Sequence, residues 1–276
     1  MRNNNYRTLP TVFHITHIKS GSQWVAQVLR ECAPEREIPQ EDWNAQTIYK
    51  PIQIGKIYPG VYLSRPRFEG QVLSHMTIGL NSHTINQLRM RPKPLVINWI
   101  NFQLLKKRFI YFIVVRDLRD TLISLFFSLK FNHKVINPVI AEQRKILNES
   151  KVEDGLIFII KNILWRVADN QESWAEEDTL RIRYEDLIQD EFAQFKKIVK
   201  HCELEVDLQK LERIVEANSF ENRTGRNRGQ EDNSSHYRKG IVGDWKNYFT
   251  PTIACVFKEH FGKTLIQTGY EKDLNW

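Results

Sequence analysis

The sequence predicts one α/β domain with three layers, in which helices flank a central, mostly parallel sheet. Short apolar runs alternate along the chain with amphipathic stretches, an order typical of parallel strands joined by helices. The run Phe109–Val115 is continuous and consists of β-branched or aromatic residues, as expected for a strand buried on both faces. No repeat and no linker divides the 276 residues, so we expect a single domain over residues 1–276.

Each element is predicted from the spacing of its apolar residues. The strand candidates are Thr11–Thr16, Val61–Leu63, Gln71–Leu73, Phe109–Val115 and Leu180–Ile182. Apolar residues recur at i, i+3, i+4 and i+7 from Val25 to Cys32 and from Leu122 to Leu129, which predicts two helices. Longer helical patterns cover Asp154–Trp174, Glu191–His201, Leu208–Ala217 and Pro251–Phe261.

One segment, Asn222–Gly240, differs from the rest of the chain. It has three glycines, five lysines or arginines and almost no apolar side chain. Such a segment cannot pack into a core, so it predicts a long mobile loop.

Composition narrows the class of protein. The chain has 40 Lys and Arg against 33 Asp and Glu, a net charge of +7, and 41% hydrophobic residues. These values exclude a disulfide-rich miniprotein and a disordered tail. The three scattered cysteines are typical of a reducing compartment. The longest apolar runs are far shorter than a membrane span, and the first ten residues precede no signal-peptide core. We therefore expect a cytoplasmic protein without a transmembrane segment.

A phosphate-binding turn is predicted after the first strand. Residues Lys19–Ser22 join that strand to a helix, so the turn offers free backbone N–H groups and the positive end of a helix dipole. Gly21 permits close approach of a ligand, and the lysine adds a charge. The turn is not a Walker A loop, because the glycines of that motif fall at Phe13 and Ile18. An ordinary strand–helix turn explains this segment equally well.

A second candidate follows the central strand. Arg116 stands where the apolar run stops, so we expect it at the carboxyl edge of the sheet, where ligands of open α/β sheets bind. Asp117 or Asp120 can cap the next helix. Ser124 lies about two turns into that helix. A lone serine there usually bonds a backbone carbonyl, but beside Arg116 and a phosphate it can donate to the ligand.

Two further segments carry polar groups. Arg238–Gly240 combines two charges with a flexible backbone, which suits a terminal phosphate. A short strand delivers Tyr184 to an edge of the sheet, and the acidic pair Glu185–Asp186 begins the next turn. Each segment alone also fits an ordinary role, as a solvated charge cluster or a strand end.

Together, the four segments resemble the PAPS-dependent sulfotransferases, where PAPS is 3′-phosphoadenosine 5′-phosphosulfate. Lys19–Trp24 is similar to the family's 5′-phosphosulfate loop, P-K-S-G-T-T-W. Val115–Asp120, with Ser124 eight residues after the arginine, is similar to the 3′-phosphate motif. Tyr184–Leu187 matches Y-E-D-L, and Arg238–Asn247 matches R-K-G-x-x-G-D-W-K-N. The motifs occur in family order over almost the whole chain, which makes the resemblance specific.

The resemblance implies PAPS as the donor, adenosine 3′,5′-bisphosphate (PAP) as the product, no required metal, and a P-loop-like phosphosulfate-binding loop. The loop over residues 222–240 is then expected to lie over the nucleotide. The residues implied to hold the 5′ end are Lys19, Ser20, Gly21, Ser22 and Gln23. Those implied around the 3′-phosphate are Arg116, Ser124, Arg238, Lys239 and Gly240, with Trp24 and Phe220 around the adenine and Tyr184 against the nucleotide.

The implied reaction is in-line transfer of a sulfuryl group to an acceptor oxygen or nitrogen. The protein positions the groups and stabilises charge, with Lys19 at the bridging oxygen. Lys19 and Ser124 are predicted catalytic residues. A histidine is the usual base near neutral pH. His75 ends the apolar stretch QVLSHM, where the family has its catalytic histidine, and is the first choice. The family's T-H-x-P reads S-H-M-T here, and His17 is the second choice.

Two other functions are weighed against this one. A P-loop kinase binding ATP and magnesium is opposed by the missing Walker glycines. A non-enzymatic nucleic-acid binder would use Arg223–Arg228, but acidic residues border that loop and no stacking aromatics accompany it. We expect a small-molecule, glycan or lipid acceptor with a hydroxyl group, and no nucleic acid. The identity of the acceptor and the oligomeric state stay open at this stage.

Overall fold

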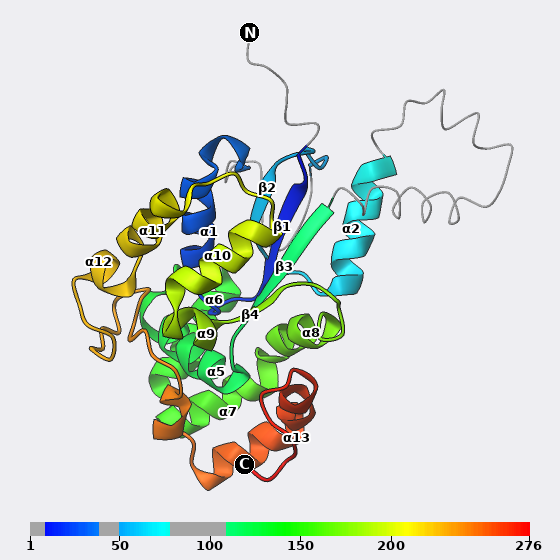
Figure 1. Ribbon diagram of the computed structural model, residues 1–276. Helices are drawn as coiled ribbons and strands as arrows, with labels where there is room; N and C mark the ends of the chain where they lie inside the picture. The colour runs from blue at the N-terminus through cyan, green and yellow to red at the C-terminus, as the bar shows by residue number, and fades with distance from the viewer. Residues whose placement is uncertain (1–8, 39–49, 78–108) are drawn as a thin grey trace, which may run out of the picture.

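Four parallel strands form the centre of the molecule in the computed structural model, which describes residues 9–38, 50–77 and 109–276, except the side chains of 73–77. Their order across the sheet is β2-β1-β3-β4 (Figure 1). The strands are β1 (Thr11–Thr16), β2 (Ile57–Val61), β3 (Phe109–Val115) and β4 (Arg181–Arg183). Because all are parallel, their carboxyl ends meet at one edge of the sheet.

Helices cover both faces of this sheet and extend beyond its carboxyl edge (Figure 1). Along the chain they are α1 (Ser22–Cys32), η2 (Pro34–Arg36), α2 (Arg65–Thr77), α5 (Leu118–Phe127), the π-helical turn η4 (Ser128–Asn132), α6 (Pro138–Glu149), α7 (Val152–Asn162), α8 (Trp165–Ser173), α9 (Tyr184–Gln189), α10 (Glu191–His201), α11 (Leu208–Ala217), α12 (Phe220–Thr224), η5 (Asp244–Asn247) and α13 (Pro251–Gln267).

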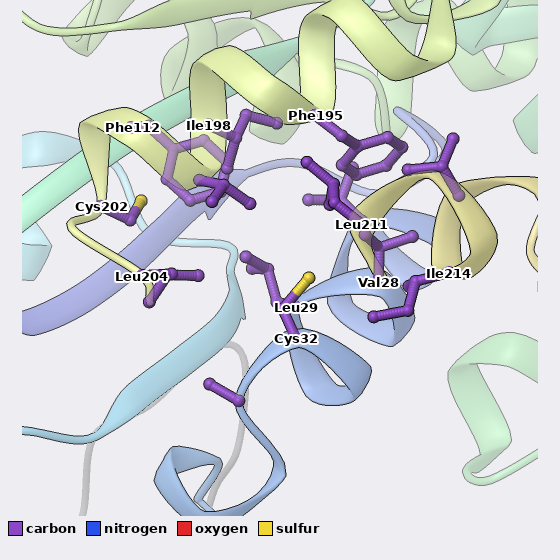
Figure 2. Packing of buried hydrophobic residues seen from close by; sticks show 14 of the residues in the cluster. Val28, Leu29, Cys32, Phe112, Phe195, Ile198, Cys202, Leu204, Leu211 and Ile214 are labelled. Atoms are coloured by element: carbon purple, nitrogen blue, oxygen red, sulfur yellow. The ribbon is translucent and has the colours of Figure 1, made fainter. Parts of the chain in front are cut away.

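One face of the sheet packs against α1, α10 and α11. Phe112 of β3 lies against Ile198 of α10, and Val28 and Leu29 of α1 fill the space toward α11 (Figure 2). The side chains of β3 alternate between the two faces, since Ile113 belongs to the core on the other side, beneath α2. This double burial confirms the prediction from the continuous apolar run.

A third cluster lies beyond the carboxyl edge, where α5, α7, α8 and α13 pack together. It contains Leu122 and Phe126 of α5 together with Phe257 of α13, all essentially without solvent exposure. The cluster fixes α5, the helix that follows Arg116 at the sheet edge.

The predicted α/β architecture is confirmed, whereas two predicted strands were wrong. Gln71–Leu73 lies within helix α2, where Phe68 and Val72 face the core together at helical spacing. The strand predicted over Val61–Leu63 ends at Val61 and begins four residues before it, with Pro59 inside it. Proline is tolerated there because β2 is the edge strand.

The long helix predicted over Asp154–Trp174 is two helices, α7 and α8, separated at Ile163 and Leu164. The predicted bounds of α10 and α11 are confirmed. No helix among the described residues is both long and apolar enough to cross a bilayer.

Candidate active site

A cavity of about 570 Å³ opens at the carboxyl edge of the sheet. A residue that follows each of the four strands contributes to its wall: Lys19 after β1, Tyr62 after β2, Arg116 after β3 and Tyr184 after β4. Twelve of the predicted site residues line it: Lys19, Gly21, Ser22, Gln23, Trp24, Arg116, Ser124, Tyr184, Phe220, Arg238, Lys239 and Gly240. The structure therefore brings segments far apart in sequence to one site.

The first wall is the turn between β1 and α1. Lys19 and Gly21 both have positive φ, 67° and 83°, and Gly21 is the N-cap of α1. Such a turn directs backbone N–H groups toward an anion at the helix N-terminus. A Cβ atom on Gly21 would lie 2.9 Å from the ring of Tyr184. Glycine is required here both by the backbone conformation and by the close approach of Tyr184.

The Lys19 side chain carries the charge of this turn. Burial, together with the positive charges of Arg116 and Arg238, lowers the pKa of its ammonium to about 8. No acidic residue lines the cavity among the described parts of the chain. An anion in the cavity would therefore restore the charge balance around Lys19.

The second wall is centred on Arg116, which is 9% exposed. Its Nη1 donates to the carbonyl of Lys19 at 3.2 Å and its Nη2 to the carbonyl of Ile241 at 3.1 Å. The guanidinium lies over the ring of Tyr184, 4.4 Å from its centroid. The Arg116 Nε is buried without a hydrogen-bond partner. Such an orphaned donor indicates a missing acceptor at this position.

Two carboxylates connect the segments that carry the cations. Asp120 accepts from the backbone N–H groups of Gly243 (2.7 Å) and Trp245 (3.0 Å), and it lies 4.0 Å from Arg116. Asp244 pairs with Lys239 at 2.8 Å and also with Arg238. Asp120 therefore connects the start of α5, next to Arg116, to the turn before α13, and Asp244 connects that turn to Arg238 and Lys239.

Aromatic side chains line another part of the wall. Trp24 and Phe220 are each 6% exposed, and the Trp24 Nε1 is buried without a partner. The Arg228 guanidinium lies 5.9 Å from the Trp24 ring and 5.5 Å from the Phe220 ring. A Cβ atom on Gly240 would approach the Phe220 ring to 2.6 Å, so this glycine lets the chain pass directly over the ring.

Three predicted site residues do not lie in the cavity wall as described. Ser20 is fully buried, and its hydroxyl bonds the carbonyl of His17 and the hydroxyl of Thr16. His17 is also buried beneath the turn. His75 follows the predicted strand Gln71–Leu73, and that strand was wrong, because both lie in helix α2. Its side chain is outside the described residues, so its role stays a prediction.

Several lining residues were not predicted from the sequence. Tyr62 donates to or accepts from the Ser22 hydroxyl at 2.6 Å, and it was missed because the bounds of β2 were misplaced. His133, Lys134 and His236 line the same cavity without belonging to any motif. Their only sequence signal is proximity to Ser124 or to the Arg238–Gly240 segment.

The segment 222–240 is bonded to itself and to the cavity wall. Gly229 donates to the carbonyl of Lys239 at 2.8 Å, and the side chain of Asn132 donates to the carbonyls of Asn233 and Ser235. Its last five residues, 236–240, line part of the cavity, whereas the position of the segment over a nucleotide stays a prediction. Its mobility stays a prediction. Among the described residues, no group of three or more His, Cys, Asp or Glu side chains could hold a metal ion.

Comparison with known proteins gives one family. A family model described as "Sulfotransferase domain" matches residues 9–269. Mouse sulfotransferase 1B1 is 27% identical over 279 residues, covering 93% of this chain and 83% of that protein. Arabidopsis thaliana cytosolic sulfotransferase 11 is 32% identical over 107 residues, covering 34% and 30%. The crystal structure of mouse sulfotransferase SULT7A1 complexed with PAP has a similar fold, with TM-score 0.56, 19% identity and coverage of 96% and 87%.

Proposed function

Since the chain belongs to the sulfotransferase domain family, it is a PAPS-dependent sulfotransferase, and we propose that the cavity at the carboxyl edge holds the donor between two cationic ends. The Lys19–Gln23 turn takes the 5′-phosphosulfate, and Arg116 with Arg238–Gly240 takes the 3′-phosphate. The observation that carries this proposal is the Lys19 ammonium, which lies in a wall without acidic residues among those described.

The residues present fit a doubly phosphorylated adenine nucleotide. The buried Nε of Arg116 and Nε1 of Trp24 have no partner, and both lie in side chains that line the cavity. A phosphate oxygen would give the Arg116 Nε a hydrogen-bond acceptor, and an adenine base would fit beside the rings of Trp24 and Phe220.

The chain's own residues then divide the chemistry. The donor supplies a sulfuryl group, whose bond to the 5′-phosphate oxygen breaks as the acceptor oxygen bonds to sulfur. Lys19 and the N–H groups of its turn stabilise the negative charge on the departing phosphate oxygen. Ser124, about two turns into α5, donates to the nucleotide, and Tyr184 holds Arg116 in place through its ring. A histidine takes the acceptor proton, with His75 as the candidate from the sequence.

The acceptor is a molecule with a hydroxyl group. The same reaction also allows the sulfuryl group to be transferred to an amine, a glycan or a lipid. The rim residues His133 and Lys134 are exposed, so an acceptor can reach the cavity past them. We also propose a cytoplasmic location, which is consistent with the name of the Arabidopsis relative.

Calorimetry with PAP tests the site directly, and transfer from labelled PAPS to a panel of phenols, alcohols and amines tests the activity. Lys19→Ala and Arg116→Ala should each weaken PAP binding at least tenfold, because each removes a charge-assisted contact. Lys246→Ala removes an exposed lysine outside the cavity wall and is the matched control. Wild-type affinity in both site variants would refute the assignment.

The two rival functions are not favoured by the family. A kinase would require magnesium, so turnover in EDTA discriminates it from a sulfotransferase. A nucleic-acid binder would shift random DNA in a salt-sensitive manner. In the structure, Arg226 and Arg228 of the basic segment donate to carbonyls of their own loop, which leaves fewer free cations for phosphates.

A further inference from the structure

His17 is a buried residue directly beneath the donor-binding turn. It is 2% exposed, and both ring nitrogens are occupied. Nδ1 lies 2.8 Å from the carbonyl of Ile18, to which it can only donate. Nε2 accepts the backbone N–H of Arg116 at 3.2 Å. The ring therefore links the end of β1 to the end of β3 in one fixed tautomer.

Gln171 of α8 completes this link from the opposite side. It is 1% exposed, and its side-chain nitrogen lies 2.7 Å from the His17 Nε2 and 2.7 Å from the carbonyl of Arg116. Both contacts are donations by the amide. Arg116 thus has its N–H and its carbonyl held by two side chains, while its guanidinium bonds the carbonyl of Lys19. A closed set of bonds connects the two donor-binding segments.

Protonation would break this set of bonds. Burial lowers the pKa of His17 to about 4, the Arg116 charge acts in the same direction, and the bond to Ile18 opposes them. The ring is therefore neutral near pH 7 and its Nε2 can accept. With both nitrogens engaged and no part in the cavity wall, His17 is not placed to take a proton from an acceptor.

We propose that His17 and Gln171 are positioning residues that hold Arg116 and Lys19 in register, so that both ends of one nucleotide are bound at once. The inference rests on the proposed function, since it assumes that these two cations bind opposite ends of the donor. If Arg116 and Lys19 were no longer held at a fixed separation, each could still bind a phosphate. The additional affinity that comes from binding both ends of one nucleotide would then be smaller.

His14, in β1 and three residues before His17, provides a matched control. It is fully buried, its ring stacks on Phe112 at 4.9 Å, and neither ring nitrogen has a hydrogen bond. Replacing His14 perturbs the core beneath the sheet without touching either donor-binding segment. A general loss of packing would therefore affect His14 and His17 variants alike, whereas loss of register would affect only the latter.

The experiment compares the affinity for PAP with that for adenosine 5′-monophosphate, which lacks the 3′-phosphate. The dissociation constant of adenosine 5′-monophosphate divided by that of PAP measures how much the 3′-phosphate adds to the affinity. His17→Leu and Gln171→Met should each lower this ratio about tenfold, the effect of losing one or two buried hydrogen bonds. His17→Gln retains an acceptor oxygen and should recover part of it. His14→Leu should leave the ratio unchanged.

The outcomes separate this inference from the proposed function. No PAP binding by the wild-type protein would overturn the proposed function itself. Normal wild-type binding with an unchanged ratio in His17→Leu and Gln171→Met would overturn only the positioning role. An equal fall in the ratio for His14→Leu would also overturn it. Gln171→Met nearly preserves side-chain volume, so it reports on the bonds even where His17→Leu unfolds.

Discussion

At the scale of single residues, the charge of Lys19 depends on its surroundings. Its pKa of about 8 reflects burial first and then repulsion by Arg116 and Arg238, whereas the bond to Asp244 raises the pKa of Lys239. Neighbouring lysines in one cavity therefore respond differently to pH. Of these two lysines, Lys19 is the one that loses its proton at the lower pH.

We expect PAP affinity to fall as the pH rises above about 8, by up to about tenfold per pH unit, because the nucleotide binds the protonated form of Lys19. Calorimetry between pH 7 and 9.5 measures this fall. Lys19→Arg stays charged throughout this range and should give a flat profile. A wild-type profile that is equally flat would show that another cation dominates binding at the 5′ end.

Gly240 gives a second prediction at this scale. Its φ is 64°, and a Cβ atom would meet the Phe220 ring at 2.6 Å. Gly225 has a nearly identical φ of 67° with nothing within 4 Å. Alanine at either position should cost about 1 kcal/mol of unfolding free energy through the left-handed backbone. Only Gly240→Ala should also displace the Phe220 ring and weaken PAP binding about tenfold. Equal PAP affinity in the two variants would contradict this role of Phe220.

At the scale of elements, Asp120 joins α5 to η5. Asp120→Ala leaves the buried N–H groups of Gly243 and Trp245 without their acceptor, which should cost about 2–3 kcal/mol of unfolding free energy and weaken PAP binding. Asp207 also accepts from two backbone N–H groups, those of Gln209 and Lys210, at the exposed start of α11. Asp207→Ala should cost about 1 kcal/mol with unchanged PAP affinity. Denaturant unfolding and calorimetry check both.

Elements with a strong, long pattern were predicted well from the sequence. The continuous run of β3 and the amphipathic stretches of α10 and α11 each leave one choice of period. The short run Gln71–Leu73 does not, because its two apolar residues fit a strand or a buried helix face equally. The bounds of β2 were misplaced because of the Pro59-Gly60 pair. A strand tolerates proline at the edge of a sheet, and the position of β2 at that edge is a property of the assembled sheet.

The site was predicted in the same uneven way. Arg116 and Lys19 could be found because each follows an apolar run that ends at the sheet edge. Tyr62 could not, because it depends on the position of β2. The bonds of His17 to Arg116 and Gln171 could not be predicted either, since they join residues 99 and 154 positions apart. Its residue type alone made His17 a candidate for the catalytic base, whereas the structure places its ring beneath the donor-binding turn.

At the scale of the whole molecule, the parallel sheet buries two neutral histidines of one segment. Burial lowers the pKa of His14 to about 3 and that of His17 to about 4, against about 6.5 in the unfolded chain. Below pH 6.5 the unfolded chain therefore binds protons that the folded protein does not bind. The sign follows from this difference: stability is complete above about pH 6.5 and falls as the pH decreases toward 4.

We expect each of these histidines to remove on the order of 3 kcal/mol of unfolding free energy between pH 6.5 and 4. Urea unfolding at half-unit intervals of pH measures the slope. His14→Leu removes one titrating group while keeping the core apolar, so its slope should be about half that of the wild type. Identical slopes for His14→Leu and the wild type would show that the acid sensitivity comes from groups outside the sheet.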